Sequence, residues 1–262
     1  MLAEFAGKVA LITGTSGIGR AVARRLASAG ASVIGLGIDP EANEAFDTLA
    51  REERLAMTAR QSDVSSTKDV AAAVADCVAH HGALDIIVNA AAVHPFGTVL
   101  TTDAATWERC MAVNVGSIYN TAHYGIPHMA ARGGGAIVNI SSVQGHNCQQ
   151  NVAAYVASKG AIHALTRAMA LDHAAAGIRV NSVSPGSVRT PLLSLAARTY
   201  GGEGVTEEQA FQRFGAAHPI GRIGEPEEIA ELVAYLASPR AGFITGSDFR
   251  IDGGLTAGLG VK

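Results

Sequence analysis

Residues 8–19 have the sequence KVALITGTSGIG, and this segment indicates the fold class of the chain. Its first half, Lys8–Thr13, is a short and almost continuous apolar run, as expected of a strand buried on both faces of a parallel sheet. A glycine-rich turn follows, and Ile18, Val22 and Leu26 then fall at i, i+4 and i+8, on one face of a helix. The order of strand, glycine turn and helix predicts the first unit of an α/β fold.

The glycine turn suits the pyrophosphate of a dinucleotide. Gly14 permits a tight turn, Gly17 lets backbone amides approach an anion, and Gly19 lets the helix pack close to the strand. The spacing G-x-x-G-x-G differs from the more usual G-x-G-x-x-G, and a turn without a ligand is the alternative. Since a strand precedes the turn and a helix follows it, we predict coenzyme binding. The residues expected to contact the coenzyme here are Gly14, Ser16, Gly17, Ile18 and Gly19.

The same alternation continues along the chain. Further strands are expected at Ala31–Ile38, Leu84–Asn89, Ala136–Ile140, Ile178–Ser184 and Ser247–Ile251, and helices at Lys68–His80, Asp103–Ala131, Asn151–Ala175 and Pro226–Ala237. Repeated strand–helix–strand order predicts a Rossmann-type, doubly wound parallel sheet with helices on both faces, in one domain over residues 1–262. The least regular stretch, Thr190–Ile220, is expected to be a mobile lid over the site.

Composition narrows the class of protein. The 262 residues are 48% hydrophobic and 16% charged, with a net charge of −3, which excludes a disordered chain and gives no electrostatic footprint for nucleic acid. No apolar run reaches the roughly 18 residues of a membrane span, and Met1–Gly7 lacks the pattern of a secretory signal. Cys77, Cys110 and Cys148 show no C-x-x-C spacing, as expected of reduced thiols in a cytoplasmic protein.

The choice of coenzyme is expected to depend on Asp39, which lies 20 residues after Gly19. A carboxylate at the end of the second strand hydrogen-bonds a free ribose 2′-hydroxyl and repels a 2′-phosphate. The segment Gly35–Pro40 holds no Arg or Lys that would bind that phosphate. We therefore expect NAD as the coenzyme, with NADP as the alternative. Asp39 would otherwise be a solvated turn residue before Pro40 with no role in coenzyme binding.

Tyr155 and Lys159, in the segment Asn151–Ala175, form a candidate catalytic pair. Tyr155 and Lys159 are four residues apart and so share one helix face. A phenol titrates near pH 10, and a nearby ammonium favours its phenolate, so Lys159 is expected to lower the pKa of Tyr155. Such a phenol exchanges a proton with an alcohol or carbonyl oxygen near neutral pH. Ser142, just after the strand Ala136–Ile140, is placed to hydrogen-bond the same oxygen.

These segments together resemble the short-chain dehydrogenase/reductase superfamily over essentially the whole chain. The matching pieces are TGTSGIG at Thr13, DV at Asp63, NAAA at Asn89, Asn114, ISS at Ile140, YVASK at Tyr155 and PGSVRT at Pro185. The resemblance implies a sheet of seven parallel strands, a homotetramer, and hydride transfer between NAD(P) and an alcohol/ketone pair.

The resemblance also implies a role for each matching residue. Tyr155 would exchange the proton, Lys159 would lower its pKa and bind the nicotinamide ribose, and Ser142 would orient the substrate oxygen. Asn114 would hold a water of the proton relay. The remaining coenzyme contacts implied are Asp63 and Val64 at the adenine, Asn89 at the adenosine side, and Val188 and Thr190 at the carboxamide.

Three departures from the family pattern are visible. The glycine loop is one residue shorter than the common T-G-x-x-x-G-x-G form, and the usual N-N-A-G reads Asn89-Ala90-Ala91-Ala92. In the family's usual register, the ribose-binding acid would fall at Gly37, two residues before Asp39. The first two departures suggest local remodelling, and the third leaves NADP open.

A polar run follows the candidate catalytic Ser142. It comprises Gln144, His146, Asn147, Gln149, Gln150 and Asn151. If the run faces the substrate, it favours a small polar molecule such as a sugar, polyol or hydroxy acid, and a solvated loop is the alternative. Substrate contacts are predicted for Ser142, Gln144, His146, Gln150, Tyr155 and His94. Despite nine histidines, no metal-ligand motif such as H-E-x-x-H is present, so no catalytic metal is expected.

Two other functions stay open at this point. One is an NADP-linked reductase of 3-oxoacyl thioesters or ketones in general. The other is a nucleotide-sensing regulatory protein, which would have no need of Ser142, Tyr155 and Lys159.

Overall fold

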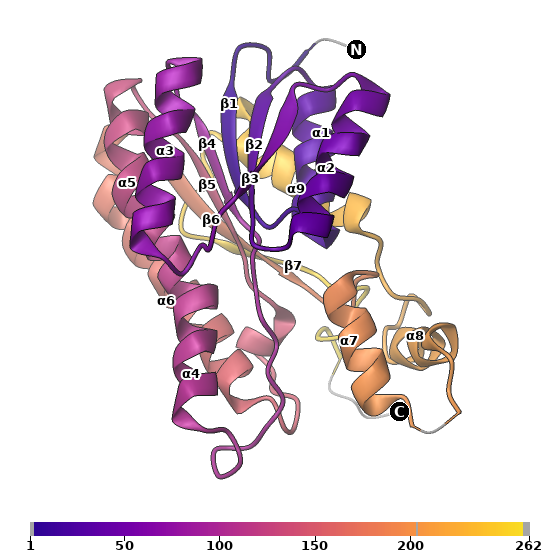
Figure 1. The fold of residues 1–262 in the computed structure, drawn as a ribbon. Coiled ribbons are helices and arrows are strands. Elements are labelled where there is room, and N and C mark those ends of the chain that lie inside the picture. Colours follow the sequence, from indigo (N-terminus) through magenta and orange to yellow (C-terminus); the bar gives the residue numbers. More distant parts are fainter. Residues whose placement is uncertain (1–2, 203, 259–262) are drawn as a thin grey trace.

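Seven parallel strands form one sheet in the order β3-β2-β1-β4-β5-β6-β7 in this computed structural model, which describes residues 3–202 and 204–258 (Figure 1). The strands are β1 Val9–Thr13, β2 Ser32–Gly37, β3 Met57–Gln61, β4 Ile86–Asn89, β5 Gly135–Ile140, β6 Ile178–Pro185 and β7 Asp248–Ile251. The strand order reverses between β1 and β4, which pair directly. In such sheets, ligands bind at the carboxyl ends of the strands beside this reversal. The predicted doubly wound fold is confirmed.

Helices cover both faces of the sheet (Figure 1). Helices α1 (Gly17–Ser28), α2 (Pro40–Glu53) and α9 (Pro226–Ala237) pack on one face, and α3 (Thr67–His81), α5 (Ser117–Ala131) and α6 (Ala153–His173) pack on the other. Residues of β1 alternate between the two hydrophobic clusters: Ala10 and Ile12 join the first, and Val9 and Leu11 the second. This double burial explains why β1 is an unbroken apolar run.

Neither β3 nor α2 was predicted from the sequence. Strand β3, MTARQ, lies at the edge of the sheet and buries only Met57 fully, so its sequence lacks the apolar run of the central strands. The sequence does contain two residues typical of a helix start at α2. Asp39 caps its N-terminus, and Pro40 occupies its first turn.

The predicted helix Asp103–Ala131 is interrupted. Helix α4 (Ala104–Met111) and α5 are joined by a π-helical turn, Ala112–Gly116. Inside this turn, the side chain of Asn114 bonds both the backbone N–H of Val93, at 2.8 Å, and its carbonyl, at 3.0 Å. The widened turn thus lets one helical residue bind the segment after β4, a kind of bulge that is frequent at functional sites.

The stretch Thr190–Ile220, which has the least regular sequence pattern, is largely helical in the structure, and its role as a lid stays a prediction. It contains α7 (Pro191–Tyr200) and α8 (Glu207–Ala216), which stand apart from the sheet in Figure 1. Thr190 caps α7, and Thr206 with Gln209 forms a capping box on α8. A small hydrophobic cluster holds the pair together; its buried members are Ala197, Ala210, Phe211 and Ile223.

Two further features bear on the sequence-based expectations. Within the described ranges, no helix combines the length and the apolar character needed to cross a membrane. Cys77 and Cys110 are buried free thiols, and Cys148 is an exposed one.

Candidate active site

The glycine turn after β1 adopts conformations that only glycine tolerates well. Gly14 and Gly17 have φ of 90° and 49°, in the left-handed region. A Cβ at Gly19 would overlap the carbonyl oxygen of Gly14, so Gly19 permits the close approach of α1 to the turn. Ser16 is the N-cap of α1 and makes no side-chain cap bond in the described structure. The first amides of α1 are therefore available to an anion.

A cavity of about 230 Å³ lies over this turn at the carboxyl ends of β1, β2 and β4. Arg109 of α4 also faces it, a residue that the sequence analysis did not single out. Predicted coenzyme residues that line the cavity are Gly14, Ser16, Gly17, Ile18, Asp39, Asp63, Val64 and Thr190. The carboxylate of Asp63 accepts hydrogen bonds from the hydroxyl and N–H of Ser65, and the Ser65 hydroxyl holds the pKa of Asp63 below its usual value.

The end of β2 explains the departure at Gly37. A Cβ at Gly37 would overlap Thr15 Oγ1 and Asn43 Oδ1, so no acidic side chain fits there. Thr15 Oγ1 donates to Asn43 Oδ1 at 2.7 Å, and Asn43 Nδ2 donates to the Gly37 carbonyl at 3.1 Å. Asp39, two residues on, is exposed at the cavity and accepts a hydrogen bond from the N–H of Glu41 at 3.0 Å.

A second cavity, of about 540 Å³, adjoins the first. The two share a wall formed by Ile18, Ala90, Ala92, Thr190 and Leu192. Ser142, Tyr155 and Lys159 line this larger cavity, together with Gln144, His94 and Val188. An elongated molecule can therefore reach from Asp39 at one end to Tyr155 at the other, which fits a dinucleotide whose reactive end lies beside Tyr155.

The candidate catalytic residues come from β5 and α6. Ser142 follows β5, and its Oγ accepts the N–H of Gln144 at 3.1 Å. Tyr155 and Lys159 lie one turn apart on α6 and are only 6% and 2% exposed. Lys159 Nζ donates to the carbonyl of Ile140 at 2.9 Å and lies 5.3 Å from the centre of the Tyr155 ring. The structure therefore brings all three side chains to one wall of the cavity.

The electrostatics of this pair differ from the sequence-based expectation. Burial raises the pKa of Tyr155 to about 12, although the neighbouring Ser142 hydroxyl lowers it, and burial lowers the pKa of Lys159 to about 8. Loss of water around the Tyr155 phenol thus opposes the lowering of its pKa that is expected from Lys159. A bound coenzyme and substrate would change that environment.

Asn114 and Asn89 support the site from behind. Asn114 Nδ2 also donates to Ser158 Oγ at 2.9 Å, so it links the segment after β4 to α6. Asn89, at the end of β4, donates to Asn139 Oδ1 at 2.8 Å and accepts from the hydroxyl of Thr121 at 2.7 Å. Both are buried among polar partners, and neither is among the described residues that line the two cavities.

His94 lies against Tyr155. Its ring centre is 4.1 Å from that of Tyr155 and 4.9 Å from that of Phe96. Burial lowers the pKa of His94 to about 4, so the ring is neutral at physiological pH. Within the described part of the chain, its Nδ1 is buried without a hydrogen-bond partner.

The polar run after Ser142 divides between two environments. Gln144, Asn147 and Gln149 line the larger cavity, as does Cys148. His146 lies elsewhere, with Nε2 2.8 Å from an oxygen of Asp248, and Gln150 is exposed and is not among the described lining residues.

Other lining residues carried no clear signal in the sequence. Tyr200 comes from α7, His218 follows α8, and Leu255 and Thr256 follow β7. Residues this far from the motifs reach the cavity only because the helical pair and the C-terminal segment fold back over it.

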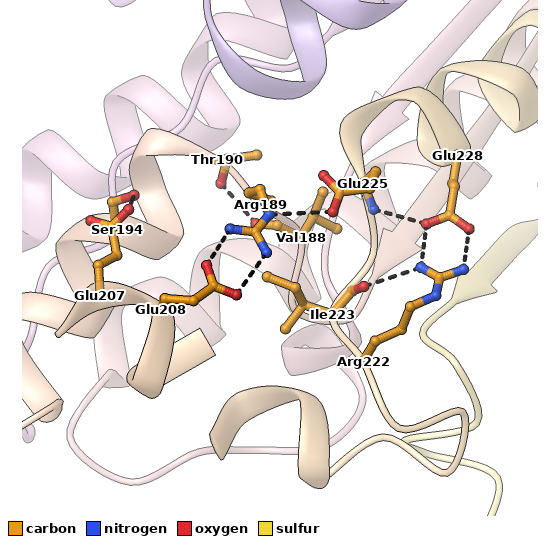
Figure 2. Close-up of polar contacts among 10 residues, drawn as sticks. All are labelled: Val188, Arg189, Thr190, Ser194, Glu207, Glu208, Arg222, Ile223, Glu225 and Glu228. Atoms are coloured by element: carbon orange, nitrogen blue, oxygen red, sulfur yellow. Dashed lines mark hydrogen bonds and ion pairs between the residues drawn. The ribbon is translucent and has the colours of Figure 1, made fainter. Parts of the chain in front are cut away.

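Ion pairs tie the α7–α8 segment to the start of α9 (Figure 2). Arg189, between Val188 and Thr190, bonds Glu208 of α8 at 2.9 Å and Glu225 at 3.3 Å. Arg222 bonds both carboxylate oxygens of Glu228 at 2.7 Å. Exposed pairs of this kind contribute little individually, but they join the two ends of a segment whose residues line the larger cavity.

The chain is similar to known proteins over almost its whole length. The family model described as "Enoyl-(Acyl carrier protein) reductase" matches residues 12–256. The cyclohexanol dehydrogenase of Acinetobacter sp. (strain SE19) is 39% identical over 260 residues, which cover 97% of each chain. The galactitol 2-dehydrogenase (L-tagatose-forming) of Cereibacter sphaeroides is 40% identical over 255 residues, 95% of each chain.

A solved structure is similar over the whole length. The ligand-free aldohexose dehydrogenase of Thermoplasma acidophilum aligns with a TM-score of 0.91 at 34% identity, covering 100% of this chain and 99% of that one.

Proposed function

The chain belongs to the short-chain dehydrogenase/reductase superfamily and is an oxidoreductase acting on CH–OH groups, and we propose that it oxidises small polar secondary alcohols with NAD through Ser142, Tyr155 and Lys159. The observation that carries the proposal is the buried Tyr155–Lys159 pair beside Ser142, at the wall of a cavity that adjoins the glycine turn. The coenzyme supplies the hydride acceptor, a chemistry that no side chain provides.

Each of the three residues has a separate task in this proposal. The Ser142 hydroxyl hydrogen-bonds the substrate oxygen and fixes its position. The Tyr155 phenolate takes the hydroxyl proton during oxidation, and the resulting phenol returns a proton to the substrate oxygen during reduction. The Lys159 ammonium, which lies 5.3 Å from the centre of the Tyr155 ring, favours the phenolate. It would also donate hydrogen bonds to ribose hydroxyls of the coenzyme. Asn114 holds the Val93 segment and Ser158 in place, and a water beside it completes the proton path.

The cavity wall supports a polar substrate. Gln144, Asn147, Gln149 and the neutral ring of His94 offer hydrogen-bonding groups, whereas Leu193, Ala196 and Phe214 supply an apolar side. This mixture suits a ring or chain that carries several oxygens. The similarity to enzymes named for galactitol and aldohexose points in the same direction, whereas cyclohexanol, for which another relative is named, carries a single hydroxyl. A panel of polyols, sugars and hydroxy acids, followed by NADH absorbance, tests the substrate class.

The coenzyme is proposed to be NAD because Asp39 is the acid nearest the end of β2. It lines the smaller cavity, and Gly37 cannot be replaced by a longer side chain. Asn89 would support the adenosine side of this cavity from behind, whereas Val188 and Thr190 line the end where the carboxamide is proposed to lie.

We predict a kcat/KM for NAD at least tenfold above that for NADP, because the Asp39 carboxylate repels a 2′-phosphate. Asp39→Asn removes the charge but keeps an N-cap side chain for α2, so it should lower the ratio of kcat/KM for NAD to kcat/KM for NADP. The matched control is Asp103→Asn, which alters the cap of α4. Initial rates with each coenzyme at saturating alcohol measure the ratio. A wild-type preference for NADP would show that this assignment is wrong.

Tyr155→Phe removes only the hydroxyl, so the ring still packs and NAD still binds. We predict that kcat for alcohol oxidation falls by at least about 10²-fold, the usual contribution of general acid–base catalysis. Lys159→Ala should weaken coenzyme binding and move the alkaline rise of the oxidation rate to higher pH. The sign follows from charge, because removing a cation disfavours the phenolate and raises the Tyr155 pKa.

The pH–rate profiles of the wild type and both variants provide the measurement. Near-wild-type turnover in Tyr155→Phe, or a Lys159→Ala profile displaced toward lower pH, would assign the proton to another residue. Retained NAD binding by Tyr155→Phe, measured by calorimetry, separates loss of chemistry from loss of fold.

A homotetramer and a cytoplasmic location complete the proposal. Large apolar side chains are exposed on several elements, among them Trp107 of α4, Tyr119 of α5, Leu171 of α6 and Phe243 before β7. Contact between copies of the chain would cover such faces. We predict a mass near four chains by light scattering at micromolar concentration, and a monomeric mass would contradict it. The free thiols suit a reducing compartment.

A further inference from the structure

Two histidines and an aspartate meet beside the candidate site without lining it. His146 belongs to the loop after Ser142, His163 lies on α6 one turn after Lys159, and Asp248 begins β7. His146 Nε2 is 2.8 Å from Asp248 Oδ2, and His163 Nε2 is 3.4 Å from Oδ1. The two imidazole rings stack, with centres 4.1 Å apart and planes inclined by 21°.

The proton positions in this cluster follow from its hydrogen bonds. Asp248 Oδ1 accepts the hydroxyls of Ser182, at 2.6 Å, and Ser184, at 2.8 Å. Since the single proton of Ser184 goes to the carboxylate, its oxygen accepts from His163 Nε2 at 3.0 Å. A carboxylate only accepts, so His146 Nε2 also carries a proton. Both Nε2 atoms are donors, and the carboxylate is satisfied by three hydrogen bonds.

This arrangement is poorly suited to a metal ion, although the three ligand atoms lie within 4.8 Å of one another. A metal needs both Nε2 atoms deprotonated, with their lone pairs converging on one point. In nearly parallel stacked rings those lone pairs run side by side. We therefore interpret the cluster as a hydrogen-bond network in which the Asp248 carboxylate and both Nε2 atoms have partners.

What the cluster holds is the loop 143–151, which lines the substrate cavity with Gln144, Asn147 and Gln149. Both ends of this loop are anchored by the backbone: Ser142 follows β5, and the Asn151 carbonyl accepts the N–H of Gly97 at 2.7 Å. Between those ends, Gln144 and Gln149 bond each other. Among the described contacts, His146 is the loop residue whose side chain bonds to an element outside the loop.

The packing beneath the loop is equally tight. A Cβ at Gly145 would overlap the ring of His163 and lie 2.9 Å from the carbonyl of Lys159. The helix that carries Tyr155 and Lys159 thus touches the loop at Gly145, and His163 fills the space between that contact and β6.

We propose that His146, stacked on His163 and bonded to Asp248, is a positioning residue that clamps the loop 143–151 onto β7 and α6 and thereby sets the substrate-facing side chains of the cavity. The proposal deepens the proposed oxidoreductase function, since its kinetic effect is seen on the alcohol substrate. His146 does not touch the coenzyme cavity, so its loss should affect the alcohol far more than NAD.

The kinetic test compares His146→Ala with His146→Gln, whose Nε2 can still donate to Asp248, and with His81→Ala, an exposed histidine on α3. We expect His146→Ala to raise the KM for the alcohol about tenfold and to leave the KM for NAD within twofold. His146→Gln should recover most of that loss, and His81→Ala should match the wild type. Asp248→Asn should add little to His146→Ala, because both break one contact.

A second readout does not need turnover. Amide hydrogen exchange should speed up in peptides covering residues 146–151 of His146→Ala, and stay unchanged in α6. If the wild type oxidises no alcohol, the proposed function fails while this exchange test still decides the clamp. Equal changes in both KM values, a His146→Gln variant as impaired as His146→Ala, or unchanged exchange would overturn the clamp. Reversible inhibition of the wild type by micromolar Zn²⁺, abolished in His146→Gln, would also overturn the clamp, because such inhibition would show that the cluster binds a metal ion.

Discussion

The burial of Lys159 is the constraint on which the candidate site depends. The Lys159 ammonium is buried in the first half of α6 and donates a hydrogen bond to the carbonyl of Ile140 at the end of β5. Burying a cation is costly, and the lowered pKa of Lys159 expresses that cost. The same contact fixes α6 against β5, so that Tyr155, one turn earlier, and Ser142, two residues beyond Ile140, line one cavity.

The cavity around this pair is assembled from segments that are distant in sequence. The loop 143–151 forms one wall, held in our account by His146 and Asp248, and the α7–α8 pair forms another, joined to α9 by Arg189. The glycine turn supplies the third side. The proposed chemistry at Tyr155 is therefore supported by α6 and by the carboxyl end of β5, whereas the walls proposed to face the substrate come from the loop 143–151 and the α7–α8 pair.

The sequence predicted the central strands and the glycine turn because both depend on local patterns: the apolar run of β1 and the left-handed glycines Gly14 and Gly17. Edge strand β3 lacked such a run, and the π-turn at Asn114 arises from a contact with Val93 that no local pattern encodes. The position of His146 likewise depends on β7, about 100 residues away, so the polar run alone could not separate it from Gln144. A lowered pKa of Tyr155 is expected from the charge of Lys159, whereas the opposing effect of burial depends on packing that the local sequence does not encode.

The free energy of unfolding of Lys159→Met and of the wild type, measured as a function of pH, tests directly whether the site contains a buried cation. Because the folded pKa of Lys159, about 8, lies below the ordinary value of 10.5, the folded state pays for the charge at neutral pH, and this penalty fades as pH rises from about 8 to above 10. Lys159→Met should be more stable than the wild type at pH 7 by about 1–3 kcal/mol, and the difference should shrink toward pH 10. A Lys159→Met variant that is less stable at pH 7, or a difference independent of pH, would contradict the central claim that the site is built around a buried cation.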